Sequence, residues 1–189
     1  MKQKITLILC TVFIMMLAAC GGGKYPLNGV WSGDVYDEDV LVVFADEFCF
    51  VIMDNDVEKL SYTYEKGEGT AKLWGEQINF KVKGNSMTLT YDGEEEIFTK
   101  DTKAKAAPKN IGGVWYGPNK WYFVCVNDML FINDEDNDLD FGKFKMNGNS
   151  GEFKCEGWLE GTFSVKGATL TVNETGYFGK EIDFSRKKN

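Results

Sequence analysis

An internal repeat is the feature that most constrains the fold of this chain. Residues 29–33 (GVWSG) recur as residues 113–117 (GVWYG), 84 positions later. Three further pairs of blocks follow in the same order: residues 54–57 and 136–139, 80–84 and 163–167, and 98–100 and 184–186. Matching blocks at a nearly constant offset indicate the duplication of one structural unit. We therefore predict two domains, at residues 25–103 and 110–189.

Each copy has the pattern of an antiparallel β-protein. Ile78, Phe80 and Val82 alternate with polar residues, as expected for a strand with one buried face. Turn residues such as Asp92-Gly93 separate the strands, and no window shows a sustained helical period. The spacing predicts about eight strands per copy. Because a meander of this length leaves an exposed edge unless it closes, we expect an all-β fold of two small tandem antiparallel barrels.

The chain begins with a pattern that is typical of a secretion signal. Lys2 and Lys4 precede an apolar stretch over residues 5–17, which is too short to span a membrane as a helix. Small residues then lead to Cys20, and this ending resembles the lipobox of bacterial lipoproteins. The resemblance implies cleavage of residues 1–19 and lipidation of Cys20, with residues 20–24 as the lipidated tether. The alternative is an ordinary secretory signal in which Cys20 is incidental.

The lipobox resemblance also implies a location in the bacterial cell envelope. No aspartate follows Cys20 to resemble a signal for retention in the inner membrane, so we expect the outer membrane, facing the periplasm. The sequence between the two copies, residues 101–109, is polar, rich in small residues and contains a proline, which predicts a linker.

Charge and composition narrow the possible functions. Without Lys2 and Lys4 the net charge falls from −8 to −10, which disfavours nucleic acid as a partner and favours basic proteins. The chain contains no histidine, so the usual general base near neutral pH and the commonest metal ligand are missing. Carboxylate chemistry remains open, but we expect a protein that is not an enzyme and that uses no cofactor.

The repeated Gly-x-Trp blocks, at residues 29–31 and 113–115, resemble the motif that opens lipocalin-like barrels. Together with the Phe-x-Val-Lys-Gly blocks, the pattern is similar to small lipocalin-like lipoproteins of Gram-negative bacteria. The resemblance implies that Trp31 and Trp115 plug one end of each barrel beneath Lys100 and Arg186, respectively. Each unit is about half the length of larger lipocalins, so the barrels are expected to enclose mainly their own side chains.

Three other tryptophans have no tryptophan at the matching position of the other copy: Trp74, Trp121 and Trp158. Strand alternation predicts that Trp74 and Trp158 point outward. We therefore consider the three as a candidate binding surface. The alternative is that the neighbouring domain covers them or that they pack singly on the surface.

The acidic run that contains Asp134, Asp136 and Asp138 has oxygen ligands at alternate positions, as calcium-binding loops do. It departs from an EF-hand loop because Leu139 replaces the glycine at the sixth position and Lys145 the glutamate at the twelfth. A solvated hairpin turn explains the run better, and calcium remains a weak alternative.

Three cysteines remain in the mature chain besides Cys20, an odd number that internal disulfides cannot use up. Matching the two copies by offset places Cys125 against Val43, Cys155 against Leu73 and Cys49 against Phe131. Apolar counterparts indicate that the cysteines serve as small buried core residues. A Cys125–Cys155 disulfide in an oxidising periplasm is the less favoured alternative.

These observations favour a non-catalytic, membrane-anchored binding lipoprotein. It would hold a small apolar ligand at a barrel mouth or a protein partner on the outward aromatic surface. The second hypothesis is an inhibitor or interaction module for a basic protein, such as a lysozyme-type enzyme, to which a net charge of −10 is suited.

Overall fold

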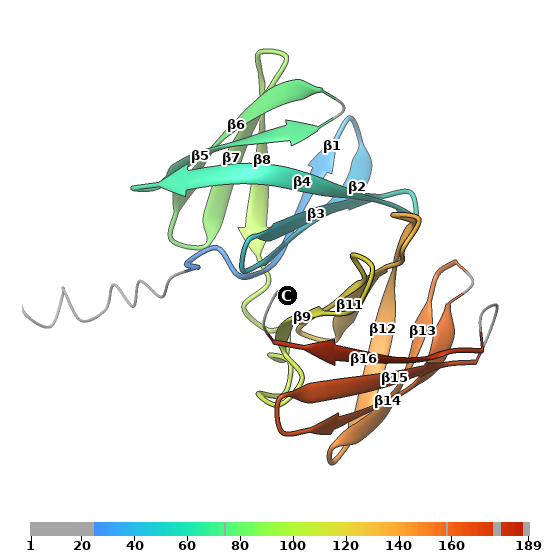
Figure 1. Cartoon of the computed structure of the whole chain (residues 1–189). Coiled ribbons are helices and arrows are strands. Elements are labelled where there is room, and N and C mark those ends of the chain that lie inside the picture. The colour runs from blue at the N-terminus through green and yellow to red at the C-terminus, as the bar shows by residue number, and fades with distance from the viewer. Residues whose placement is uncertain (1–24, 74, 158, 176–178, 187–189) are drawn as a thin grey trace, which may run out of the picture.

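A computed structural model describes residues 25–186 except 74, 158 and 176–178 (Figure 1). The described part consists of strands and connections, and it holds no helix long and apolar enough to cross a membrane. The first eight strands are β1 (Gly29–Val35), β2 (Glu38–Ala45), β3 (Phe48–Met53), β4 (Asp56–Glu65), β5 (Glu68–Leu73), β6 (Glu76–Lys83), β7 (Ser86–Tyr91) and β8 (Glu94–Lys100). The second eight are β9 (Gly113–Tyr116), β10 (Tyr122–Val126), β11 (Met129–Asn133), β12 (Leu139–Asn147), β13 (Ser150–Cys155), β14 (Glu160–Lys166), β15 (Thr169–Glu174) and β16 (Glu181–Ser185).

The strands form two closed antiparallel barrels, one from each copy of the repeat. In the first barrel β1 to β8 follow one another, and β1 closes on β8 with Trp31 opposite Lys100. In the second barrel β9 to β16 do the same, with Tyr116 of β9 opposite Ser185 of β16. Closure leaves neither barrel with an unpaired edge strand. The predicted all-β fold of two tandem barrels is confirmed.

Tight turns join the strands at the positions where the sequence places turn residues. Asp54-Asn55 and Asp92-Gly93 have positive φ at both residues, as two-residue hairpin turns require. Tyr36-Asp37 adopts the same conformation without a glycine or asparagine. The strand boundaries therefore follow from local turn chemistry.

Strand alternation gives each barrel its own apolar core. In β6, Ile78 and Phe80 face inward and are buried, whereas Asn79 and Lys81 are exposed. The first core centres on Trp31, Phe44, Phe80 and Phe98, and the second on Trp115, Phe123, Phe163 and Phe184.

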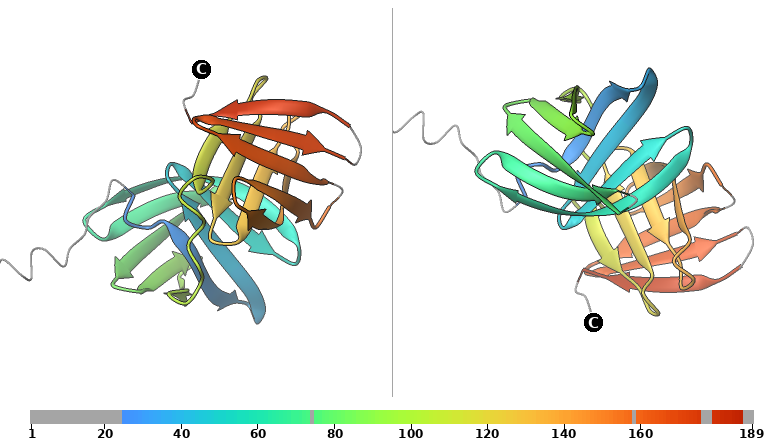
Figure 2. Two further views of the ribbon diagram at one scale, coloured as in Figure 1. Left: turned by 90° about the horizontal axis from the view of Figure 1, so that it is seen from below. Right: turned by 90° about the horizontal axis from the view of Figure 1, so that it is seen from above.

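A third apolar cluster lies between the barrels, where the outer faces of β1 to β3 meet those of β9 to β12 (Figures 1 and 2). Phe50 and Phe131 stack there with their ring centroids 4.0 Å apart and their planes 5° from parallel. Strand register makes these two residues equivalent, because Phe50 pairs with Val43 and Phe131 with Val124. The two copies therefore meet through equivalent surfaces.

Strand register corrects two of the three cysteine matches made from the sequence. Trp31 pairs with Val42, and Trp115 pairs with Phe123, so Val42 and Phe123 are equivalent. The first hairpin of the second barrel is shorter, which lowers the offset before β10 begins. A shift of one residue moves a side chain to the other face of a strand. The counterpart of Cys125 is therefore Phe44, and not Val43. The counterpart of Cys49 is Leu130, and not Phe131. Cys155 does correspond to Leu73.

Candidate functional site: an apolar cavity in the first barrel

The first barrel encloses an apolar cavity of about 210 Å³. It is larger than the roughly 150 Å³ engineered cavity that binds benzene or xenon, and smaller than pockets for drug-sized ligands. The cavity opens at the end of the barrel where β1–β2 and β7–β8 turn, and its lining there includes Tyr36, Glu38 and Tyr91. The deeper lining is apolar and includes Val40, Val42, Phe44, Ala71, Ile78 and Phe98.

Two neighbouring positions of the cavity lining carry small side chains where the second barrel carries large ones. When the two copies are matched by strand register, Val40 and Val42 of β2 are equivalent to Trp121 and Phe123 of the second barrel. Trp121 is 4 % exposed, and both aromatic side chains belong to the second core. The expectation that Trp121 forms part of a binding surface is therefore wrong, because its indole fills the barrel interior.

A second exchange redistributes side-chain volume between the neighbouring strands. Ala71 of β5 corresponds to Phe153 of β13, and Ile78 of β6 to Gly161 of β14. A Cβ atom on Gly161 would lie 3.0 Å from the Phe153 ring and 2.2 Å from the Asn173 carbonyl oxygen. The absence of a side chain at Gly161 therefore makes room for the phenyl ring that fills this level of the second barrel.

The opposite end of each barrel is closed by a tryptophan beneath a cation. Trp31 donates its indole N–H to the Leu27 carbonyl (3.0 Å), and Trp115 donates to the Ile111 carbonyl (2.7 Å). Lys100 Nζ lies 5.3 Å from the Trp31 ring centroid. The Arg186 guanidinium carbon lies 3.7 Å from the Trp115 centroid.

Arg186 is held more firmly than Lys100. Its guanidinium donates to the carbonyls of Gly112 (2.5 Å) and Asn110 (3.2 Å), whereas Lys100 makes one long contact, of 3.5 Å, to the Leu27 carbonyl. Partial burial lowers the pKa of both cations. These four residues close the barrel ends, and none of them lines the cavity.

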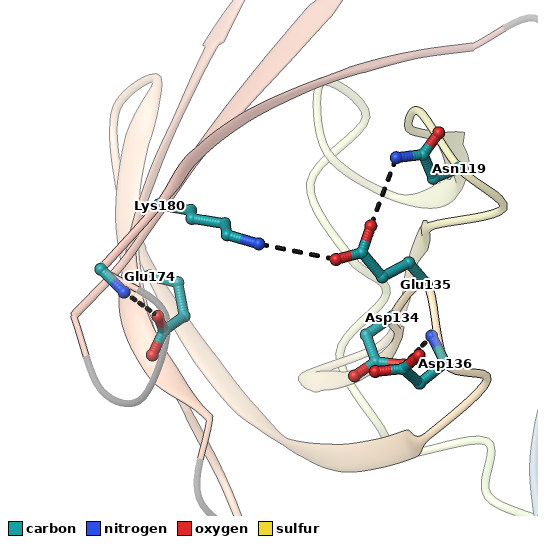
Figure 3. Close-up of polar contacts among 7 residues, drawn as sticks. Asn119, Asp134, Glu135, Asp136, Glu174 and Lys180 are labelled. Atoms are coloured by element: carbon teal, nitrogen blue, oxygen red, sulfur yellow. Dashed lines mark hydrogen bonds and ion pairs between the residues drawn. The ribbon is translucent and has the colours of Figure 1, made fainter.

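The second barrel differs at its other end too, where polar side chains bridge the loops (Figure 3). The Glu135 carboxylate accepts a hydrogen bond from Asn119 (3.2 Å) and lies 3.5 Å from the Lys180 ammonium. Glu174 is buried and accepts the backbone N–H of Gly179 (2.7 Å). These contacts join the loop before β10, the loop after β11 and the loop before β16 across the filled end.

The acidic run after β11 forms a turn stabilised by its own carboxylate. Asp134 is 1 % exposed, and its Oδ1 accepts the backbone N–H of Asp136 at 2.9 Å (Figure 3). The same oxygen accepts the backbone N–H of Asp138, also at 2.9 Å. Asp136 and Asp138 themselves are exposed. Among the described residues no three metal-ligating side chains converge. The arrangement is that of a hairpin turn, in which Asp134 is occupied by backbone donors.

Cys49, Cys125 and Cys155 are buried and free of disulfides. Cys49 belongs to the cavity lining, and Cys125 and Cys155 to the second core. Burial raises the pKa of all three thiols, which keeps them neutral. They act as small apolar side chains in the barrel interiors.

A separate groove of about 590 Å³ lies between the two barrels. Its carboxylates come from the turn between β3 and β4, from β4, from the loop before β12 and the start of β12, and from the turn after β13: Asp54, Asp56, Glu58, Asp138, Asp140 and Glu156. Among the described residues of its lining there is no basic side chain. This groove could not be predicted from the sequence, because it depends on how the two barrels pack against each other.

Comparison with known proteins adds no functional assignment. Neither the models of known protein families nor the curated protein sequences include a significant match to this chain. Trp74 and Trp158, the other two tryptophans of the expected binding surface, lie outside the described residues.

Proposed function

We propose that this protein is a non-catalytic binding lipoprotein of the bacterial envelope that holds a small apolar ligand in its first barrel. The cavity of about 210 Å³ carries this proposal. A duplicated unit whose second copy is filled at the matching positions supports a functional role for the space in the first. Small, apolar and nearly enclosed cavities bind apolar molecules without a polar anchor.

The chemistry of the lining supports binding rather than catalysis. The chain has no histidine, and Cys49 carries the one thiol among the described residues of the lining. Burial raises the pKa of this thiol, so the reactive thiolate is disfavoured. The closed antiparallel barrels and the cation over each Gly-x-Trp tryptophan support the lipocalin-like resemblance.

The membrane anchor is part of the same proposal. Lys2, Lys4, the apolar stretch and Cys20 support lipidation, and the residue after Cys20 supports the outer membrane facing the periplasm. Cys20→Ser should abolish labelling by radioactive palmitate and detergent partitioning of the protein. Continued palmitate labelling of the variant would contradict the anchor.

A thermal-shift titration tests the apolar site. A ligand at 100 times its Kd stabilises the folded protein by about 2.7 kcal/mol. 1-Octanol should raise the midpoint of unfolding of the wild type, and Val42→Phe should abolish this shift by placing in the first barrel the ring that Phe123 provides in the second. Val172→Ile, in the second barrel, is the control and should retain the shift. An equal shift in the Val42→Phe variant would contradict the proposed site.

The groove between the barrels favours a second candidate function, the capture of a basic protein. Its six carboxylates and the net charge of the mature chain would attract a cationic surface, such as that of a lysozyme-type enzyme. Binding of hen lysozyme that weakens with salt and with Asp56→Asn/Glu58→Gln would support this function. Binding unaffected by these substitutions would exclude the groove.

A further inference from the structure

The mouth of the cavity differs from its interior in being strongly acidic. Four hairpins form this end of the first barrel, at residues 35–38, 53–56, 73–76 and 91–94. Each of them carries at least one carboxylate, and none carries a lysine or arginine. We call this set the acidic mouth: Asp37, Glu38, Asp54, Asp56, Glu76, Asp92 and Glu94, all of which are exposed.

One further carboxylate lies on the inner face of the barrel near the acidic mouth. Glu96 of β8 alternates with the buried Phe98 and pairs with Leu89, which lines the cavity. Glu96 is half-buried, and the structure shows no ion pair for it among the described residues. The equivalent residue of the second barrel is Ile182, which is buried. The first barrel thus has a carboxylate where its copy has a core side chain.

The corresponding end of the second barrel has mixed charge. Lys120 stands in the hairpin between β9 and β10, and Lys180 reaches Glu135 across the end. That end also carries several carboxylates, among them Glu135, Asp136 and Glu181, so the end of the first barrel differs in having no lysine or arginine in its four hairpins and an open cavity beneath them.

From this combination we infer that the first barrel selects amphiphiles with a short apolar tail and a positively charged head. The tail would occupy the cavity, and the head would lie among Glu38, Glu96 and the acidic mouth. An anionic head, such as a fatty-acid carboxylate, would meet like charges at the mouth and an apolar lining below it. A cationic head keeps its hydration at the mouth and gains the attraction of several carboxylates.

This inference rests on the proposed function, since it needs an apolar site for the tail. Three probes with the same tail separate the two: octylammonium, 1-octanol and octanoate, each below its micelle concentration. Isothermal titration with the mature two-barrel chain carrying Cys20→Ser avoids competition from detergent or lipid. We expect octylammonium to bind at least about tenfold more tightly than octanoate at low salt, with 1-octanol between them. The difference should shrink in 1 M salt, where the screening length falls to about 3 Å.

Carboxamide variants locate the effect at the mouth. Glu38→Gln/Glu96→Gln should weaken octylammonium binding about threefold or more and strengthen octanoate binding, and it should change 1-octanol binding less than that of either charged probe. The control Glu65→Gln/Glu68→Gln removes the same charge from the turn at the closed end of the same barrel and should change each affinity less than twofold. Binding of 1-octanol with equal or tighter binding of octanoate than of octylammonium would overturn the charge selection alone. If none of the three probes binds, the proposed apolar site fails as well.

Discussion

The two barrels share strand order, register and a tryptophan-plugged end, yet they differ inside. At three matched positions the first barrel has Val40, Val42 and Ala71 where the second has Trp121, Phe123 and Phe153. The hydrogen-bonded framework does not require these differences, because both barrels close with the same strand order. The same strand framework therefore holds a filled interior in the second copy and an apolar cavity in the first.

The interface between the barrels supports one wall of the first barrel. Phe50 and Phe131 stack between the barrels, and the outer faces of β2 and β3 are as buried as their inner faces. The wall of the first barrel on this side is therefore packed against a filled neighbour. The cavity lies behind that wall and opens at the acidic mouth.

The largest difference in stability between the two barrels should follow from removing an aromatic ring from the filled second barrel. Phe123→Ala should lower the free energy of unfolding by about 3–5 kcal/mol, because the removed ring contacts Phe153, Phe163 and Phe184 and leaves a new cavity. Val42→Ala at the matched position should cost less, since it enlarges a space that already exists. Urea titration of both variants measures the difference. Equal losses would show that the first barrel is packed as tightly as the second.

Adding a ring should affect the two barrels in opposite ways. Val42→Phe fills the cavity and should be neutral or raise the free energy of unfolding by up to about 2 kcal/mol. Val172→Phe adds the same group to the second core, where it should cost about 1–3 kcal/mol through overpacking. Amide hydrogen exchange can assign each change to its own barrel. Destabilisation of the first barrel by Val42→Phe as large as that of the second by Val172→Phe would contradict the hollow interior.

Removing the cation at the closed end of either barrel should have a smaller effect on stability, and the effect should be larger for the second barrel than for the first. Arg186→Ala should cost about 1–2 kcal/mol, because it removes the stacking on Trp115 and two hydrogen bonds to carbonyls. Lys100→Ala should cost less, since the ammonium lies farther from Trp31 and makes one long contact. Both are measured by urea titration. A free energy of unfolding of Arg186→Ala within error of that of the wild type would contradict a stabilising role of the cation.

Alkaline pH should act on a half-buried phenol that packs against the core of the first barrel, where the second barrel has a phenylalanine. Burial raises the pKa of Tyr62 from 10.0 to about 12, and its hydroxyl donates to the Asp46 carbonyl (2.5 Å). Since folding favours the neutral phenol, this contribution to stability is full below pH 10 and is lost as the pH rises toward 12. The matched residue of the second barrel is Phe144. In Tyr62→Phe the free energy of unfolding should therefore fall less steeply over this pH range. An equally steep fall would contradict a contribution from Tyr62.

Much of the fold follows from local sequence signals. The repeat, the alternation in β6 and β14, and the Asp-Asn and Asp-Gly turns specify two antiparallel barrels without tertiary information. The matching of Trp31 with Trp115, and of Lys100 with Arg186, likewise depends only on the order of blocks. These features were predictable because strand period and turn chemistry act over a few residues.

The candidate site was less predictable because it depends on exact register. A shift of one residue in matching β2 with β10 placed Cys125 against Val43, which faces the interface, and hid the correspondence between Val42 and Phe123. Trp121 was considered as part of a binding surface because the other copy has no tryptophan at the matching position, although its side chain lies inside the second barrel. The groove between the barrels depends on their packing, for which the sequence carries no local signal.

The most direct test of the hollow first barrel is its response to xenon, which occupies dry apolar cavities of about this size. Methyl NMR spectra of the mature chain carrying Cys20→Ser would be recorded under increasing xenon pressure. We predict saturable shifts for Val42, Ala71 and Ile78 of the first barrel, and none for Ile132 and Val172 of the second. Unshifted methyl groups in the first barrel, or equal shifts in both barrels, would contradict the account.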